Sequence, residues 1–173
     1  MIWAIKNCLL GAMVSLMTVE ITEALSDDLP EILQLQRQAY VSEAELVGSY
    51  DIEPLQQTLA GLQQDFAKGN VLKAVTEGKI IASIRAFVEG NTVYVGKLMV
   101  QPDWQNKGLG GRLLRAIEGF YPQMRYELFT SSKSVKNIYL YEKIGYKEFQ
   151  RKQISSDLQM IFLEKQVDFF QAK

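Results

Sequence analysis

The sequence contains no histidine, and Cys8 is the only cysteine among its 173 residues. Without histidine, the commonest general base and metal ligand is missing, so acid–base chemistry must rely on Glu, Asp, Tyr, Lys or bound water. A single cysteine forms neither an intramolecular disulfide nor a thiolate metal cluster. These absences exclude zinc hydrolases and Ser–His–Asp hydrolases, and we expect no metal.

A strong charge of either sign is also lacking, because the net charge is only −1. The net charge therefore gives no electrostatic reason to expect binding to nucleic acid or to a membrane surface. No internal repeat, low-complexity run or linker divides the chain, whose length suits one domain. We expect a single domain over residues 18–173 in a cytoplasmic protein.

Residues 1–17 are mostly apolar, with Lys6 as their only charge. This segment is too short and too interrupted for a transmembrane helix, and it lacks a clear signal-peptide cleavage site. Met13 and Met17 are alternative start sites. Three interpretations remain: an extension without a function, an added element that packs on the domain, and a membrane anchor, which is the least favoured.

The spacing of apolar residues predicts alternating strands and helices from residue 19 onward. Strands are expected over 19–24, 71–77, 79–89, 125–130, 146–152 and 158–164, with one more ending at Val100. Helices are expected from Ser26 to Tyr40, from Pro54 to Phe66, from Gly108, and over 135–143. The order β-α-α-β-β-β-α-β-α-β-β predicts an α/β fold, with a mixed sheet flanked by helices.

A glycine-bearing loop, Gln105-Asn-Lys-Gly108-Leu-Gly110, lies where an apolar strand passes into a helix. Glycines at such a junction let backbone N–H groups approach an anion without an intervening Cβ. The helix N-terminus adds free donors and the positive end of its dipole. The loop therefore indicates a phosphate site; an ordinary strand-to-helix connection is the alternative.

A second motif, Leu140-Tyr141-Glu-Lys-Ile-Gly145-Tyr146, follows about thirty residues later. Together with Gln105-x-x-Gly108-x-Gly110, it resembles the paired motifs of the GNAT (Gcn5-related) N-acetyltransferase superfamily. The resemblance runs from about residue 19 to residue 165. It implies the GNAT fold, acetyl-CoA as co-substrate and transfer of an acetyl group to an amine.

The resemblance also implies where the cofactor binds. The glycine loop would hold the pyrophosphate, and the pantetheine arm would enter a gap where the fourth and fifth strands splay apart. Ser134 stands where many relatives carry an Asn that contacts this arm, and Asn137 one turn later is the possible substitute. Lys107, Lys133 and Lys136 either assist with the phosphates or are solvated surface lysines. The residues expected to bind acetyl-CoA are Leu98, Met99, Val100, Gln105, Asn106, Lys107, Gly108, Leu109, Gly110, Gly111, Ser134, Asn137 and Tyr141.

Tyr141 is the residue expected to act as general acid, because the tyrosine of the second motif commonly fills that role in relatives. The thiolate that leaves when an amine attacks a thioester benefits from a proton donor. The alternative is a core tyrosine whose hydroxyl only satisfies a hydrogen bond. Tyr139 and Tyr146 are assigned to packing.

The resemblance further implies that the segment between the first two helices holds the acceptor. No Lys or Arg occurs from Gln38 to Ala67, and the acidic residues there are Glu43, Glu45, Asp51, Glu53 and Asp65. A negative field would attract a cationic amine; a solvated acidic loop is the alternative. Glu43 or Glu45, acting directly or through water, is the expected base, with Glu127 next. Arg85 and Lys97, on central strands, either pair with these acids or bind an acceptor carboxylate.

The main hypothesis is an N-acetyltransferase that acts on a primary amine of a small molecule or peptide. Direct attack in a ternary complex is favoured, since Cys8 lies outside the motif region and no other thiol could carry an acyl group. A non-catalytic acyl-CoA-binding sensor or interaction module on the same fold is the alternative. A homodimer through the late strands is possible, and the apolar residues 167–170 would either support it or close the core.

Overall fold

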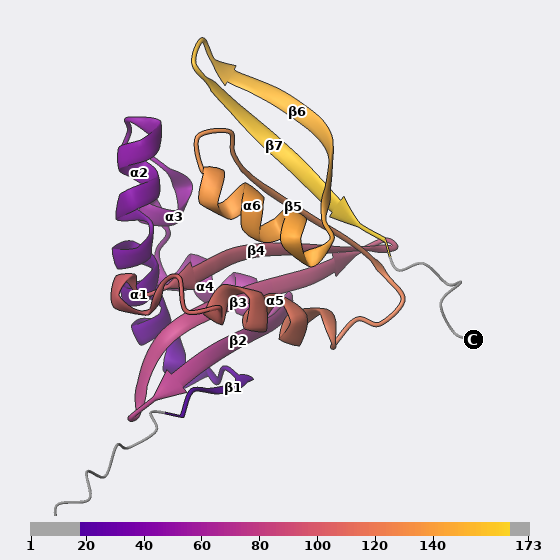
Figure 1. Cartoon of the computed structure of the whole chain (residues 1–173). Coiled ribbons are helices and arrows are strands. Elements are labelled where there is room, and N and C mark those ends of the chain that lie inside the picture. The colour runs from indigo at the N-terminus through magenta and orange to yellow at the C-terminus, as the bar shows by residue number, and fades with distance from the viewer. Residues whose placement is uncertain (1–17, 167–173) are drawn as a thin grey trace, which may run out of the picture.

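A seven-stranded mixed sheet, in the order β1-β2-β3-β4-β5-β7-β6, organises residues 18–166, the part of the chain that the computed structural model describes (Figure 1). All neighbouring strands are antiparallel except β4 and β5, which are parallel. The strands are β1 (Glu20–Glu23), β2 (Gly69–Thr76), β3 (Lys79–Glu89), β4 (Thr92–Val100), β5 (Arg125–Ser131), β6 (Lys147–Ser155) and β7 (Leu158–Lys165). The predicted mixed α/β sheet is confirmed.

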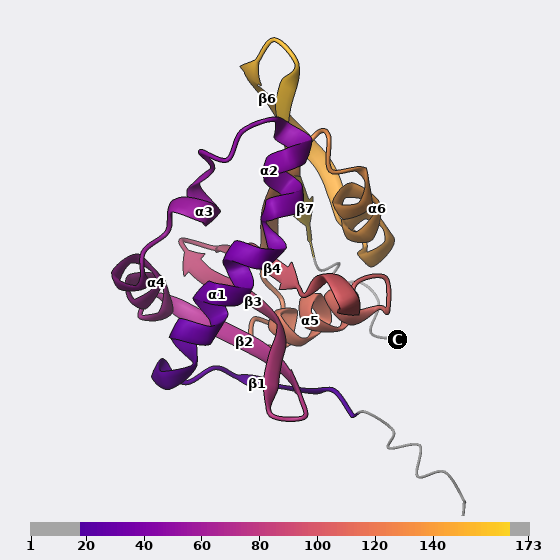
Figure 2. The same cartoon turned by 90° about the vertical axis from the view of Figure 1, so that its left-hand side faces the viewer.

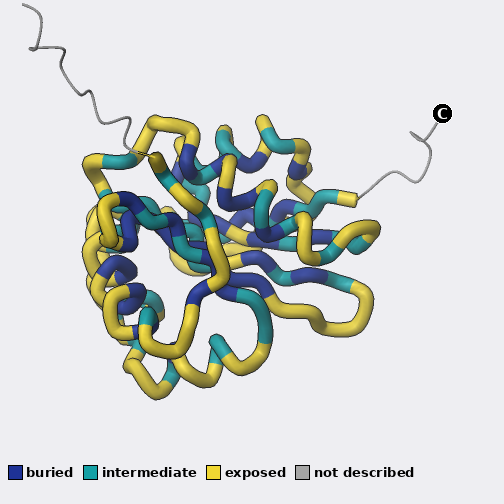
Figure 3. The backbone as a smooth tube through the Cα atoms, turned by 90° about the horizontal axis from the view of Figure 1, so that it is seen from below, coloured by how far each residue is buried: buried dark blue, intermediate teal, exposed yellow. Residues whose placement is uncertain are grey.

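Helices cover both faces of this sheet (Figure 2). They are α1 (Leu29–Ala39), α2 (Val41–Val47), α3 (Glu53–Gln56), α4 (Leu59–Phe66), α5 (Leu109–Glu118) and α6 (Val135–Ile144), with short 3₁₀ turns at Ser26–Asp28 and Pro102–Trp104. Leu113, Leu114 and Ile117 of α5 pack on one face, and Ile32 of α1 with Leu62 of α4 pack on the other. Most of β3 is buried because both of its faces are covered. Figure 3 shows the buried residues, in dark blue, gathered in the interior of the molecule.

Tight turns connect the first three long strands, as the sequence predicts. Glu77 and Gly78, between β2 and β3, have φ values of 49° and 74°. Two consecutive positive φ values are typical of the hairpin turn whose twist matches that of the strands. Gly90, between β3 and β4, also has a positive φ, of 59°.

The segment between α1 and β2 differs from the prediction. The single helix expected from Pro54 to Phe66 is wrong, because Gln57 is extended and divides it into α3 and α4. Thr58 then caps α4 by accepting a hydrogen bond from the Gly61 N–H at 3.1 Å. The short helix α2 was not predicted at all, and it ends at Gly48 in the left-handed conformation. Thr58 is a favoured N-cap residue, so it starts a new helix where the apolar spacing alone shows no break.

Strands β4 and β5 pair over only three residues. Thr92, Val93 and Tyr94 lie opposite Arg125, Tyr126 and Glu127, and no pairing continues toward the C-terminal ends of these strands. Within β4, the register against β3 also shifts, and Lys97 at this bulge has a positive φ of 50°. The gap expected between the fourth and fifth strands is therefore present, next to a local distortion of β4.

Two of the sequence-based expectations fall outside the described residues: the extension over 1–17 and the apolar residues 167–170. None of the helices between residues 18 and 166 is long and apolar enough to cross a bilayer.

Candidate functional site

A cavity of about 1630 Å³ lies at the gap between β4 and β5. Its walls come from residues 94–100 of β4, residues 127–131 of β5, the loop before α5, helix α6, and the segment from α1 to α3. A site for one drug-sized ligand usually measures about 300–1,000 Å³. The cavity therefore has room for a cofactor arm and a second molecule. All the residues expected to bind acetyl-CoA line it except Lys107.

The glycine loop is shaped by backbone conformation rather than by long side chains. Gly108 is the N-cap of α5, with a φ of 77° in the left-handed region that favours glycine. The Gln105 side chain turns back and donates from Nε2 to the Val100 carbonyl at 3.1 Å, which ties the loop to the end of β4. The first N–H groups of a helix have no intrahelical acceptor. The entrance of α5 therefore offers donors for an anion at the cavity wall.

The two sequence motifs meet in space at Gly110. A Cβ built on Gly110 would lie 3.1 Å from the Leu140 side chain of α6. A glycine here therefore lets α5 and α6 approach each other closely, and the glycine loop comes next to the helix that carries Tyr141. Each motif is recognised from a short stretch of sequence, and the fold brings the two stretches into contact.

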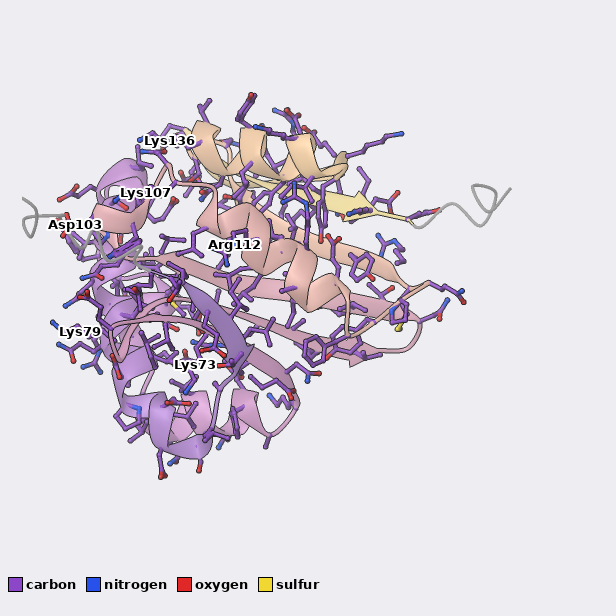
Figure 4. The ribbon with its side chains drawn as sticks, turned by 60° about the horizontal axis from the view of Figure 1, so that its bottom comes forward. Lys73, Lys79, Asp103, Lys107, Arg112 and Lys136 are labelled. Carbon is purple, nitrogen blue, oxygen red and sulfur yellow. The ribbon has the colours of Figure 1, made fainter. Side chains whose placement is uncertain are left out.

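The three lysines considered for the phosphates have different surroundings. Lys107 does not line the cavity, and its Nζ lies 4.8 Å from the centre of the Trp104 ring. Lys133 lines the cavity but forms a 2.7 Å ion pair with Asp157. Lys136 of α6 also lines it, and Figure 4 shows Lys136 and Lys107 on the same side of the molecule. Of the three, Lys136 alone both lines the cavity and has no ion pair among the described residues.

Tyr141 is buried, with 8% of its surface exposed, and it lines the cavity. Its ring meets that of Tyr146 edge-on, with the ring centres 6.1 Å apart. Burial raises the pKa of the Tyr141 hydroxyl above its usual value, and the nearby Glu43 carboxylate raises it further. The hydroxyl is therefore protonated at neutral pH, as a proton donor must be.

Glu43 reaches from α2 to the start of α6. Its Oε1 accepts a hydrogen bond from Asn137 Nδ2 at 3.0 Å, and its Oε2 accepts one from the Ser134 hydroxyl. Ser134 is the N-cap of α6, so the carboxylate lies at the positive end of this helix. The two α6 side chains expected to contact the pantetheine arm are thus bound to Glu43. The structure thus brings Glu43 of α2 into contact with α6, the helix that carries Tyr141.

The other two candidate bases are placed differently. Glu45 lines the cavity but is exposed, and its contact with the Tyr50 hydroxyl is long, at 3.5 Å. Glu127 forms an ion pair with Arg125 at 2.7 Å. Glu43 is therefore the carboxylate that the protein holds by two hydrogen bonds and leaves without a cationic partner among residues 18–166.

Arg85 is the centre of a polar network beneath the acceptor segment. Its Nη1 donates to Gln57 Oε1 at 3.0 Å and to Asp65 Oδ2 at 3.2 Å, and its Nη2 donates to Gln36 Oε1. Gln36 also donates to the Pro54 carbonyl at 2.8 Å. Arg85 therefore pairs with Asp65, an acid of the acceptor segment. Pairing with these acids is one of the two interpretations that the sequence leaves open for Arg85.

Lys97 projects from the β4 bulge toward the same segment. It forms an ion pair with Glu53, and its Nζ lies 5.8 Å from the centre of the Tyr40 ring. Burial lowers the pKa of Lys97 to about 8 despite this ion pair. A fraction of this side chain is therefore neutral near physiological pH.

Tyr40 and Gln36 were not expected at the site; the sequence assigns both to the core-facing side of the first helix. Burial raises the pKa of Tyr40, and so do Tyr141 and Glu43, whereas Arg85 opposes the shift. Tyr40 therefore lies near three titratable groups of the cavity: Tyr141, Glu43 and Arg85. A fully buried glutamine at a helix position that otherwise holds Leu or Ile was the available signal, because a buried amide requires polar partners.

The family comparison agrees with this geometry. Residues 67–148 match the model of the acetyltransferase (GNAT) domain. This range contains β3 and β4, the glycine loop, α5 and the Tyr141 helix. The UPF0157 protein YqkA of Bacillus subtilis is 27% identical over 119 residues, which cover 68% of this chain and 34% of YqkA. The chain therefore spans about a third of the curated relative that it matches.

Solved structures with the same fold include acetyltransferases with bound cofactor. The PaiA N-acetyltransferase of Thermoplasma acidophilum, in complex with coenzyme A, has a TM-score of 0.73 at 17% identity, covering 87% of this chain and 100% of its own. A GNAT superfamily phosphinothricin acetyltransferase of Sinorhizobium meliloti, in complex with acetyl-CoA, has a TM-score of 0.69 at 17% identity, covering 87% and 89%. The chain is therefore similar to GNAT acetyltransferases, in sequence over residues 67–148 and in overall fold.

Proposed function

We propose that this protein is an acetyl-CoA-dependent N-acetyltransferase that transfers the acetyl group to a primary amine of a small molecule or peptide. The observation that carries the proposal is that Tyr141 and Glu43 line the same cavity as the glycine loop at the start of α5. The loop and the open ends of β4 and β5 bind acetyl-CoA, which supplies the activated acetyl group. The two acetyltransferase structures of similar fold that contain coenzyme A or acetyl-CoA support this assignment.

The reaction proceeds by direct attack within a ternary complex. Glu43 accepts a proton from the acceptor ammonium, directly or through water, so that the neutral amine attacks the thioester carbonyl. A C–N bond forms, the C–S bond breaks as the tetrahedral intermediate collapses, and Tyr141 gives its proton to the departing thiolate. Ser134 and Asn137 act as positioning residues because they hold the Glu43 carboxylate.

Titration calorimetry with acetyl-CoA and with desulfo-CoA tests the cofactor site. Thiol release from acetyl-CoA in the presence of polyamines, amino acids, aminoglycosides and peptide N-termini tests catalysis. We expect binding of both cofactors and amine-dependent thiol release. Binding without release for every amine class would favour the non-catalytic acyl-CoA-binding module, and no binding of either cofactor would overturn both functions.

A further inference from the structure

The acceptor side of the cavity contains a buried arginine that the protein satisfies only in part. Arg85 is 6% exposed, and its two terminal nitrogens are hydrogen-bonded. Its Nε is buried and has no hydrogen-bond partner among residues 18–166. A buried donor on a charged group that lacks an acceptor is destabilising. Burial also lowers the pKa of Arg85, although Asp65 acts in the opposite direction.

Lys97 is a second cation, and its positive charge is only weakly compensated by its partner. The Lys97 side chain is 20% exposed, whereas its partner Glu53 is 66% exposed and belongs to the four-residue helix α3. An ion pair with an exposed carboxylate contributes little to stability and is readily exchanged. Burial lowers the pKa of Lys97 to about 8 even with Glu53 in contact. Each of the two cations therefore has one carboxylate partner, but Arg85 Nε lacks an acceptor among residues 18–166 and the partner of Lys97 is mostly exposed.

The two cations lie next to each other in the sheet. Arg85 of β3 is paired with Gly96 of β4, and Lys97 is the next residue along β4. Both side chains line the cavity, and both are close to Tyr40: Lys97 lies 5.8 Å from its ring centre, and Arg85 influences its pKa. Tyr40 is therefore close both to these cations and to Glu43, which has no cationic partner in the described part of the chain.

We propose that Lys97, with Arg85 beside it, binds a carboxylate of the acceptor, so that the acceptor is a carboxylate-bearing amine such as an amino acid. This inference rests on the proposed acetyl transfer and names its substrate class. The amine of such an acceptor faces Glu43, and its carboxylate faces Lys97. In the free protein, Lys97 forms an ion pair with Glu53, and the acceptor carboxylate replaces Glu53 as the partner of Lys97. The charges of the cavity are then matched at both ends of the ligand.

The test compares L-amino acids with their carboxamides as ligands of the protein saturated with coenzyme A. Titration calorimetry should show that at least one amino acid binds about tenfold or more tightly than its amide, as expected for a charge-assisted contact. Lys97→Met should remove this preference, and Lys97→Arg should retain part of it. Glu53→Gln should tighten binding of the carboxylate, because it removes the competing group.

Lys68→Met is the matched control, because Lys68 also lines the cavity but is 65% exposed. We expect this variant to keep the preference for the carboxylate. Equal binding of acids and amides, no binding of any amino acid, or a preference that persists in Lys97→Met would each overturn the inference. Amide-selective thiol release would contradict it while leaving acetyl transfer intact. Carboxylate-selective binding without thiol release from any amine would instead count against the proposed catalysis.

Discussion

At the scale of single residues, the two carboxylates of α2 differ in how firmly they are held. Glu43 accepts hydrogen bonds from Ser134 and Asn137, whereas Glu45 is exposed and has only a long contact with Tyr50. A fixed position matters for a base, because proton transfer requires hydrogen-bond geometry in the reactive complex. The structure therefore favours one of two bases that the sequence leaves equal.

Glu43→Gln should lower kcat by about 10²-fold or more, since an amide cannot accept the ammonium proton. The amide oxygen can still accept one of the two α6 hydrogen bonds, so the change in the fold is small. Steady-state kinetics with a saturating amine provide the measurement. Glu45→Gln is the matched variant and should change kcat by no more than about twofold, because solvent competes with any exposed contact of this side chain. Equal losses in both variants would contradict the assignment.

Tyr141→Phe should lower kcat by about 10²–10⁴-fold while acetyl-CoA binding changes little, because only the proton donor is removed. Calorimetry for binding and thiol release for turnover separate the two effects. Tyr139→Phe is the control on the same helix, since the Tyr139 side chain is exposed. Turnover by Tyr141→Phe at the rate of the unaltered protein would remove Tyr141 from the role of acid.

At the scale of elements, the junction between β4 and α5 depends on one backbone conformation. Gly108 is in the left-handed region with a φ of 77°, and a Cβ there would meet no other atom within 4 Å. Any effect of a substitution at this position therefore comes from the backbone rather than from a clash.

Gly108→Ala should destabilise the fold by about 1–2 kcal/mol, the usual penalty for a left-handed L-residue. It should also weaken acetyl-CoA binding, because the altered loop moves the N–H groups at the entrance of α5. Gly90→Ala is the matched control, with a φ of 59° and equally open surroundings in the turn between β3 and β4. It should lower stability similarly in urea denaturation but leave the Kd of acetyl-CoA unchanged. A parallel loss of affinity in both variants would contradict this role of the loop.

The elements also show what local sequence can and cannot predict. Hairpins, the glycine loop and the Tyr141 helix follow from spacing over a few residues, and each was predicted close to its observed bounds. The break at Gln57 was missed because leucines continue in helical spacing on both sides of it. The contacts of Glu43 with Ser134 and Asn137 span more than 90 residues, so no periodicity in the sequence indicates them.

At the scale of the whole molecule, ligand binding should stabilise the fold, because the cavity joins residues from most of its elements. Acetyl-CoA at about 100 times its Kd should add about 2.7 kcal/mol to the free energy of unfolding. For a domain of this length, the melting temperature should rise by roughly 5–10 °C. Thermal denaturation with and without the ligand provides the measurement. A melting temperature that stays constant up to millimolar acetyl-CoA would contradict the cofactor site.

Stability should also depend on pH through Lys97. Its pKa is about 8 in the folded chain, against about 10.4 for an exposed lysine. The unfolded chain therefore binds this proton more tightly, and the contribution of Lys97 to folding becomes more favourable as pH rises from about 8 to about 10. Relative to Lys97→Met, the unaltered protein should gain on the order of 2–3 kcal/mol across this range in urea denaturation. A constant difference between the two proteins would contradict the lowered pKa.

The short pairing between β4 and β5, three residue pairs long, also affects how the two parts of the sheet are held together. Within residues 18–166 the sheet has two parts, β1-β2-β3-β4 and β5-β7-β6, whose strands pair with each other only at Thr92–Tyr94 and Arg125–Glu127. Helix α2 lies between β1 and β2 of the first part in the chain, and α6 follows β5 of the second. The Glu43 side chain of α2 is hydrogen-bonded to Ser134 and Asn137 at the start of α6. Glu43 therefore connects α2 to α6 across the side of the sheet where β4 and β5 are not paired. Any movement of α6 away from α2 would therefore have to break the two hydrogen bonds that Glu43 accepts.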